Sequence, residues 1–98
     1  MAGLFQQTQE SYYQQSQTFD GNGSAKVFTL LTTHFPSIPS VKSDIRIFVN
    51  RKEIDVDNYS YSSPAITFSG NTNNTDVLES DGAPKDGFSV VVKERAAS

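Results

Sequence analysis

Apolar and polar residues alternate in short runs along most of this chain, and turn residues separate the runs. The clearest run covers residues 43–49, where Ile45, Ile47 and Val49 occupy every second position. A period of two residues is typical of a β-strand with one buried face. We therefore predict a strand here, with Phe48 on the opposite face from the three aliphatic residues.

Six further runs have the length and composition of strands. They cover residues 15–19, 26–31, 52–56, 59–62, 65–69 and 88–94. In residues 26–31 both faces are apolar. Phe28 and Leu30 share one face, and Val27 and Leu31 share the other. That arrangement is typical of a strand inside a sandwich or at an interface between subunits.

Turn residues divide these runs. Residues 20–24 read Asp-Gly-Asn-Gly-Ser, and Gly and Asn tolerate the positive φ of tight turns. Pro36 and Pro39 remove backbone donors and exclude a central strand from their neighbourhood. Residues 50–51 reverse the chain between two strands. Residues 70–87 form a polar loop that is longer than most connections, and loops of this length are usually functional or mobile.

The expected fold is all-β, a small antiparallel β-sandwich of six to seven strands with an extended N-terminal arm. The chain has 98 residues, which is enough for one hydrophobic core. We assign residues 1–14 to the arm and residues 15–98 to the sandwich. The arm is rich in Gln, and Glu10 is its one charged side chain. It is either a frayed terminus or a segment that becomes ordered on a neighbouring subunit, and its adjacent tyrosines favour the second interpretation.

Composition excludes several classes of protein. The net charge is −3, which argues against nucleic acid as a partner, because binding to it would need a cluster of Lys and Arg. There are no cysteines, which excludes disulfides, thiolate metal sites and a cysteine nucleophile. The start of the chain does not resemble a signal peptide, and no apolar run approaches the length of a membrane span. We therefore expect a protein made in the cytoplasm, with neither nucleic acid nor membrane as a partner.

The sequence offers no convincing catalytic or metal-binding group. His34 is the only histidine, and it has no nucleophile motif to act on. Asp20, Asn22 and Ser24 resemble the opening of a calcium loop, but the twelfth position is Leu31 instead of a glutamate, so a turn is the better interpretation. We expect no enzyme activity, no cofactor and no metal.

Four segments carry a resemblance to a known family. They read FDGNGSAKVFTL at 19–30, IRIFVNRKEI at 45–54, YSYS at 59–62 followed by AITF at 65–68, and APKDGFSVVV at 83–92. In order and spacing they resemble a small β-sandwich module of tailed-bacteriophage structural proteins, which occurs in podophage tail-fibre attachment domains and related virion accessory proteins. The family usually has Gly after the hairpin Asn. Here the residue is Arg51, which predicts a looser or bulged turn.

The resemblance implies a virion structural protein without enzyme activity. It would dock onto other virion proteins (tail, connector or capsid subunits) in symmetric multiple copies, as a tail or fibre-attachment component. The chain stops at Ser98 where a fibre would continue into a shaft, so docking without the shaft is expected. The location would be the virion, after synthesis in the host cytoplasm. The candidate protein-interaction residues are apolar side chains of the arm and strands: Leu4, Phe5, Tyr12, Tyr13, Phe28, Leu30 and Phe48.

Two alternatives remain open. A capsid decoration or cement protein would use the same module to join neighbouring shell subunits. A carbohydrate-binding module would stack a host surface glycan on exposed aromatic rings, for which Tyr12, Tyr13, Tyr59 and Tyr61 are available. The absence of Trp disfavours this second alternative.

Overall fold

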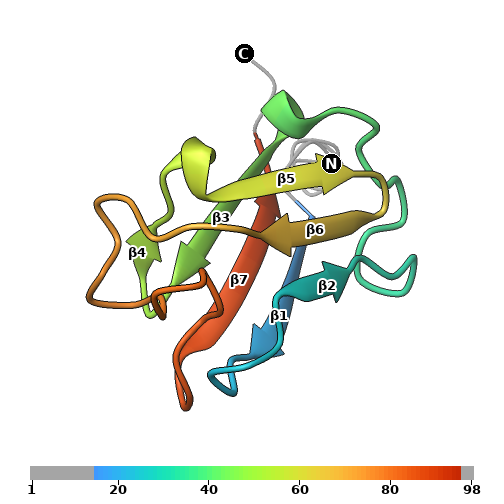
Figure 1. Ribbon diagram of the computed structural model, residues 1–98. Coiled ribbons are helices and arrows are strands. Elements are labelled where there is room, and N and C mark those ends of the chain that lie inside the picture. The colour runs from blue at the N-terminus through green and yellow to red at the C-terminus, as the bar shows by residue number, and fades with distance from the viewer. Residues whose placement is uncertain (1–14, 96–98) are drawn as a thin grey trace, which may run out of the picture.

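A computed structural model describes residues 15–95, and in this range the chain forms two antiparallel sheets (Figure 1). The first sheet has the order β1 (Ser16–Asp20), β7 (Ser89–Glu94), β3 (Ile45–Val49) and β4 (Lys52–Glu53). The second has the order β2 (Val27–Thr29), β6 (Ala65–Phe68) and β5 (Tyr59–Ser62). Two short 3-10 turns, η1 (Lys42–Asp44) and η2 (Val56–Asn58), precede β3 and β5. The expected small all-β sandwich is confirmed, with seven strands.

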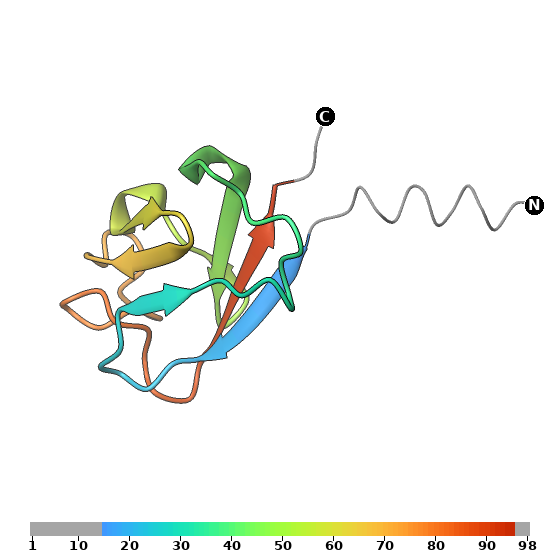
Figure 2. The same cartoon turned by 90° about the vertical axis from the view of Figure 1, so that its right-hand side faces the viewer.

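The two sheets lie face to face as separate layers, and their strands cross at a steep angle (Figures 1 and 2). Within residues 15–95 no helix is long and apolar enough to cross a membrane. The proposed arm, residues 1–14, lies outside the described residues.

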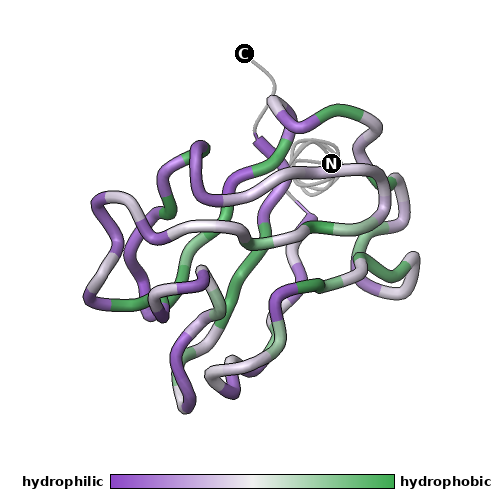
Figure 3. The backbone as a smooth tube through the Cα atoms, viewed as in Figure 1, coloured by the Kyte–Doolittle hydropathy of each residue, from purple (hydrophilic) through white to green (hydrophobic). Residues whose placement is uncertain are grey.

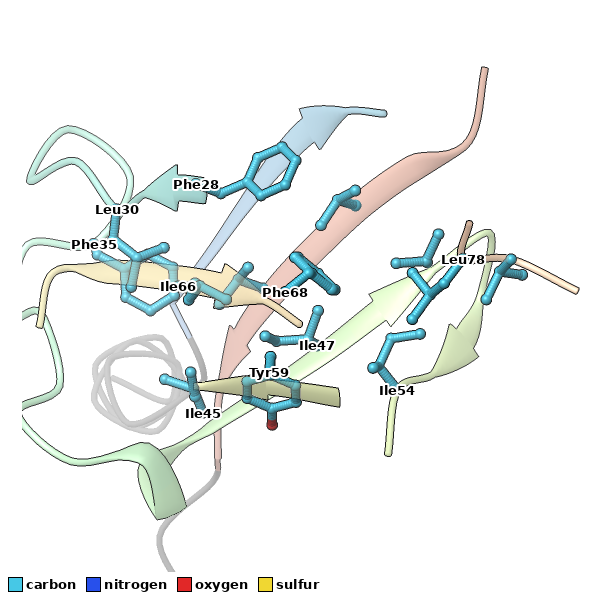
Figure 4. Packing of buried hydrophobic residues seen from close by; sticks show 14 residues of the cluster. Phe28, Leu30, Phe35, Ile45, Ile47, Ile54, Tyr59, Ile66, Phe68 and Leu78 are labelled. Atoms are coloured by element: carbon cyan, nitrogen blue, oxygen red, sulfur yellow. The ribbon is translucent and has the colours of Figure 1, made fainter. Parts of the chain in front are cut away.

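One hydrophobic core fills the space between the sheets, and the central strands β3 and β7 supply many of its hydrophobic positions (Figure 3). Ile45, Ile47 and Val49 point inward from β3, as their alternation predicts. From the other sheet, the ring of Phe28 packs edge-on against Phe68, with 5.6 Å between the ring centroids (Figure 4). Such edge-to-face contacts add to the stabilisation that comes from burial alone.

The turn at residues 20–24 packs against the last connection of the chain. The backbone N–H of Gly21 donates to the carbonyl of Phe88 at 2.8 Å, and that of Gly23 donates to Pro84 at 2.9 Å. A Cβ atom on Gly21 would lie 2.6 Å from the carbonyl oxygen of Lys85, so only glycine fits. The Asn22 carboxamide oxygen accepts two backbone N–H groups of its own turn, which explains this residue by turn geometry.

The hairpin at residues 50–51 corrects the expectation of a looser or bulged turn, which is wrong. Asn50 and Arg51 have φ of 51° and 71°, and Val49 pairs directly with Lys52. Positive φ at both central residues is the geometry of a two-residue type I′ turn, whose twist matches that of the strands. The backbone N–H of Ile54 donates to Ile47 at 2.8 Å and holds this register. Arg51 is thus kept in the left-handed region, at a cost of about 1–2 kcal/mol.

The polar loop 70–87 folds back onto the core. Its residues Val77 and Leu78 are almost completely buried in the hydrophobic core. Two buried asparagines, Asn58 and Asn74, hold the loop through hydrogen bonds to each other and to the backbone of Thr72 and Asp55. Their buried amides pair with each other and with these backbone groups, so no amide is left without a partner in the interior. The loop is therefore part of the domain's packing.

Candidate interaction surfaces

The structure divides the predicted interaction residues into three groups. Phe28 and Leu30 are 7% and 2% exposed and lie in the core, so a partner could reach them only if the sandwich opened. Phe48 lies on the outer face of the first sheet. The remaining four are in the arm, outside the described residues: Leu4, Phe5, Tyr12 and Tyr13.

The two faces of the segment 26–31 explain why Phe28 and Leu30 are buried. Alternation along 26–31 predicts two apolar faces correctly, but it does not say which face meets the other sheet. The inward face carries the aromatic ring, which buries more area than an aliphatic side chain. The outward face leaves Val27 and Leu31 about half exposed, at 58% and 51%. Val27 in β2 and Leu31, just after it, are therefore the accessible candidates in residues 26–31.

Phe48 stands in a row of outward side chains across the first sheet. The register places Phe48 directly opposite Val91 of β7 on one side and Glu53 of β4 on the other. A shallow groove of about 250 Å³ runs beside the aromatic ring. We call this groove the Phe48 surface and define it by its lining residues: Phe48, Arg51, Ser89, Val91 and Lys93.

Cations gather around the Phe48 ring. Arg46 and Lys93 are directly opposite each other in the sheet, and their charged groups lie 5.2 and 5.5 Å from the ring centroid. Both distances are within the range of cation–π attraction. Like charges at facing positions of a sheet repel each other, so this pair is stable only with other compensation.

Glu53 compensates one of these two cations. Its carboxylate accepts from Nε and Nη2 of Arg46 at 3.1 and 3.0 Å, which lowers the pKa of Glu53 and raises that of Arg46. In the part of the chain that the structure describes, neither Lys93 nor Arg51 has a carboxylate within 4.0 Å. The Phe48 surface therefore combines an apolar floor with two cations that can receive an anionic group.

The outer face of the second sheet has a different chemistry. It carries small or β-branched side chains without a charge: Val27, Thr29, Ser60, Ser62, Ala65 and Thr67. We call it the uncharged face. At its edge, the carbonyl of Lys26 accepts the N–H of Phe68 in β6, and the N–H of Leu30 donates to the carbonyl of Pro64, just before β6. The backbone groups of the alternate residues Val27 and Thr29 therefore point to the open edge of β2.

Neither described tyrosine offers an open ring for a sugar. Tyr59 is 3% exposed, and its burial raises the pKa of the phenol. The hydroxyl group of Tyr61 donates to the carbonyl of Pro39, and its ring packs against the core. Stacking on these two residues, which a carbohydrate-binding module would need, is therefore not supported by their positions.

Four residues of the Phe48 surface were not singled out from the sequence as interaction residues: Arg51, Ser89, Val91 and Lys93. The position of Val91 could have been predicted, because alternation along 88–94 places its side chain on the opposite face of the strand from Val90 and Val92. Lys93 then follows on the same face. Arg51 could not have been found, since its contribution depends on the type of hairpin.

The described residues gather little else of chemical interest. Among residues 15–95 no three His, Cys, Asp or Glu side chains lie close enough to hold a metal ion together. His34 is exposed in the connection that follows β2. Asp55 accepts the backbone N–H of Asp57 at 2.9 Å and so caps η2, which is a structural role. No model of a known protein family matches the chain, and no curated protein matches its sequence.

Proposed function

We propose that this protein is a non-enzymatic structural component of a tailed-bacteriophage particle, which docks onto other virion proteins in multiple symmetric copies at the tail or fibre-attachment region. The observation that carries the proposal is the Phe48 surface, an aromatic and aliphatic floor flanked by Arg51 and Lys93, which no carboxylate of residues 15–95 approaches within 4.0 Å. The resemblance of four sequence segments to a virion β-sandwich module supplies the context.

The chemistry of this surface supports binding to a protein. Interfaces are enriched in aromatic residues and arginine at their centres, and a few such residues supply most of the binding energy. Phe48 and Val91 provide the apolar contact, while Arg51 and Lys93 favour a partner that carries carboxylates. The uncharged face adds a second surface that can approach another protein without the desolvation of any ion.

Mass spectrometry and immunogold labelling of purified particles would test the proposal, with the phage whose genome encodes the chain. We expect the protein in intact particles, in several copies, with gold particles at the tail vertex. Label over the whole shell would instead indicate a cement protein. Absence of the chain from purified particles would refute both assignments.

A variant connects the surface to this function. The substitution Phe48→Ser removes the aromatic contact and leaves the core intact, because the side chain points away from the other sheet. We expect particles that no longer retain the protein, while circular dichroism of the isolated variant stays that of a β-sandwich. Val56→Ser is a matched control, since Val56 is an apolar side chain that is 54% exposed and does not line the Phe48 surface.

A further inference from the structure

The Phe48 surface has a geometry that specifies its occupant more closely. Lys93 and Arg51 both line the groove, with Phe48 and Val91 between them in the sheet, because Val91 is two residues before Lys93 and Arg51 follows β3. An extended segment that lies along the groove can therefore place an apolar side chain on the floor. A carboxylate two residues away then reaches a cation at one end. Two residues of extended chain span about 6.6–6.8 Å, which is also the spacing of outward residues along β7.

One segment of the chain itself has this pattern. Residues 10–13 read Glu-Ser-Tyr-Tyr, and in an extended conformation Glu10 and Tyr12 point to the same side. Glu10 is also the only charged residue among residues 1–14. A segment whose only charged side chain is a carboxylate near an aromatic ring complements an apolar groove with cations at its ends, where residues 15–95 supply no carboxylate.

We propose that the Phe48 surface binds the N-terminal arm of a second copy of this chain, with Tyr12 on Phe48 and Val91 and with Glu10 paired to Lys93 or Arg51. This inference rests on the proposed function in one respect, namely that the protein acts in multiple copies. It names the contact that joins those copies. The joined copies then meet the virion partner through their uncharged faces, and Phe48→Ser weakens that attachment because it separates the copies.

The entry of the chain into the domain favours a second copy over the same molecule. Gln15 is fixed, because its carbonyl accepts the N–H of Glu94 at 2.9 Å and its amide bonds to the backbone N–H and carbonyl of Ser37. Ser16 lies opposite Lys93 in the sheet. Six residues of extended chain would carry Glu10 about 20 Å beyond that point.

A return to the molecule's own groove would require a tight reversal between Glu10 and Gln15. The intervening residues are Ser-Tyr-Tyr-Gln, which contain no Gly, Pro, Asn or Asp to form such a turn. Tyr12 would also lie inside that turn and could not rest on Phe48. A neighbouring copy within about 20 Å needs no reversal, so exchange between copies is the geometry that the chain allows without strain.

Sedimentation equilibrium of the full chain and its variants would test the proposal. We expect reversible, concentration-dependent self-association. Tyr12→Ala and Phe48→Ala should each raise the dissociation constant about tenfold or more, because they remove the aromatic anchors. Ser11→Ala is the matched control in the arm, since Ser11 points to the opposite side, and it should leave the constant unchanged.

A charge exchange makes the test specific. Lys93→Glu and Arg51→Glu place an acid where Glu10 would bind, and at least one of them should raise the dissociation constant about threefold to tenfold. Adding Glu10→Lys to that variant should restore the wild-type value. Lys26→Glu carries the same change of charge away from the groove and should have no effect.

Three results would overturn the proposal. One is a full chain that remains monomeric up to high concentration. Another is self-association that either Tyr12→Ala or Phe48→Ala leaves unchanged. The third is that Glu10→Lys restores association in neither the Lys93→Glu nor the Arg51→Glu variant. If the protein is a monomer and particles still incorporate it, arm exchange is refuted and the virion function is supported. If the protein is an oligomer that weakens as expected in the variants but no particle incorporates it, the virion function is refuted and arm exchange is supported.

Discussion

Asn58 provides the most direct test of how the long loop is held. Its side chain is 1% exposed and makes three hydrogen bonds. The amide nitrogen donates to the carbonyl of Thr72 at 2.7 Å and to the carboxamide oxygen of Asn74 at 2.8 Å, while the amide oxygen accepts the N–H of Thr72 at 2.8 Å. Asn58→Ala removes all three of these bonds in one substitution.

The expected magnitude follows from these contacts. Each hydrogen bond contributes about 1 kcal/mol net, and a buried partner that is left unpaired costs about 1–3 kcal/mol. Thr72 is exposed and regains water, whereas Asn74 is buried and does not. We therefore expect Asn58→Ala to lower the free energy of unfolding by about 3–4 kcal/mol. That is a large share of the roughly 5–15 kcal/mol of a typical domain.

Urea denaturation followed by circular dichroism would measure this change. With a slope of about 1–1.5 kcal/mol per molar urea, the midpoint should fall by about 2–4 M. Asn71→Ala is the control in the same loop, because Asn71 holds the loop through its backbone carbonyl, which accepts the N–H of Asn74 at 2.9 Å. A loss of less than about 1 kcal/mol for Asn58→Ala, equal to the control, would refute the idea that the amide network holds the loop.

The isosteric variant Asn58→Asp adds a dependence on pH. The carboxylate would face the Thr72 carbonyl and the Asn74 oxygen, so burial and these acceptors should raise its pKa in the folded state. The penalty should then be small below the unfolded pKa of aspartate and grow as the pH rises towards the raised folded pKa. A midpoint that is independent of pH, measured relative to wild type, would contradict this reasoning.

Three further predictions concern the turns and the surface ion pair. Arg51→Gly should raise the free energy of unfolding by about 0.5–1 kcal/mol in urea titrations, because glycine adopts φ of 71° without strain. Gly21→Ala should lower it by about 3 kcal/mol or more through its clash with backbone, whereas Gly87→Ala, with open space around it and φ of 88°, should cost only about 1 kcal/mol. The Arg46–Glu53 pair lowers the folded pKa of Glu53, so its contribution should be present above the unfolded pKa and be lost as the pH falls through the folded one. Glu53→Gln should abolish that part of the pH dependence in the same titrations.

The strands could be predicted from the sequence because their alternation is local. The prediction for 59–62 coincides with β5, and that for 43–49 differs from β3 only by the 3-10 turn η1 at its start. Period-2 alternation identifies a strand and its two faces. Alternation does not identify which strands pair with each other in a sheet, so the order β1-β7-β3-β4 could not be predicted in this way.

The features that sequence reasoning missed depend on contacts between distant segments. The polarity of 70–87 suggests a solvated loop, but the amides of Asn58 and Asn74 allow it to pack on the core. Arg51 disfavours a tight turn by itself, yet the burial of Val49 and the register of the hairpin impose one. In both cases the tertiary contact outweighs the local preference. The Phe48 surface was missed for the same reason, because strand pairing brings Lys93 and Arg51, which are distant in sequence, to one groove.

The two outer faces differ in a way that matters for assembly. The first sheet presents Arg46, Lys93 and Arg51 around one aromatic ring, so a partner there must supply a carboxylate or pay the full desolvation of these cations. The second sheet presents no charge over three strands and leaves the backbone edge of β2 open. Such a face accepts an apposed sheet or an added strand with little selectivity of charge. Selective recognition should therefore reside at Phe48, and the larger, less selective contact should reside on the uncharged face. A ring of copies joined through Phe48 would present the uncharged face of every copy to one common partner, which is how a small domain with weak individual contacts attains stable attachment.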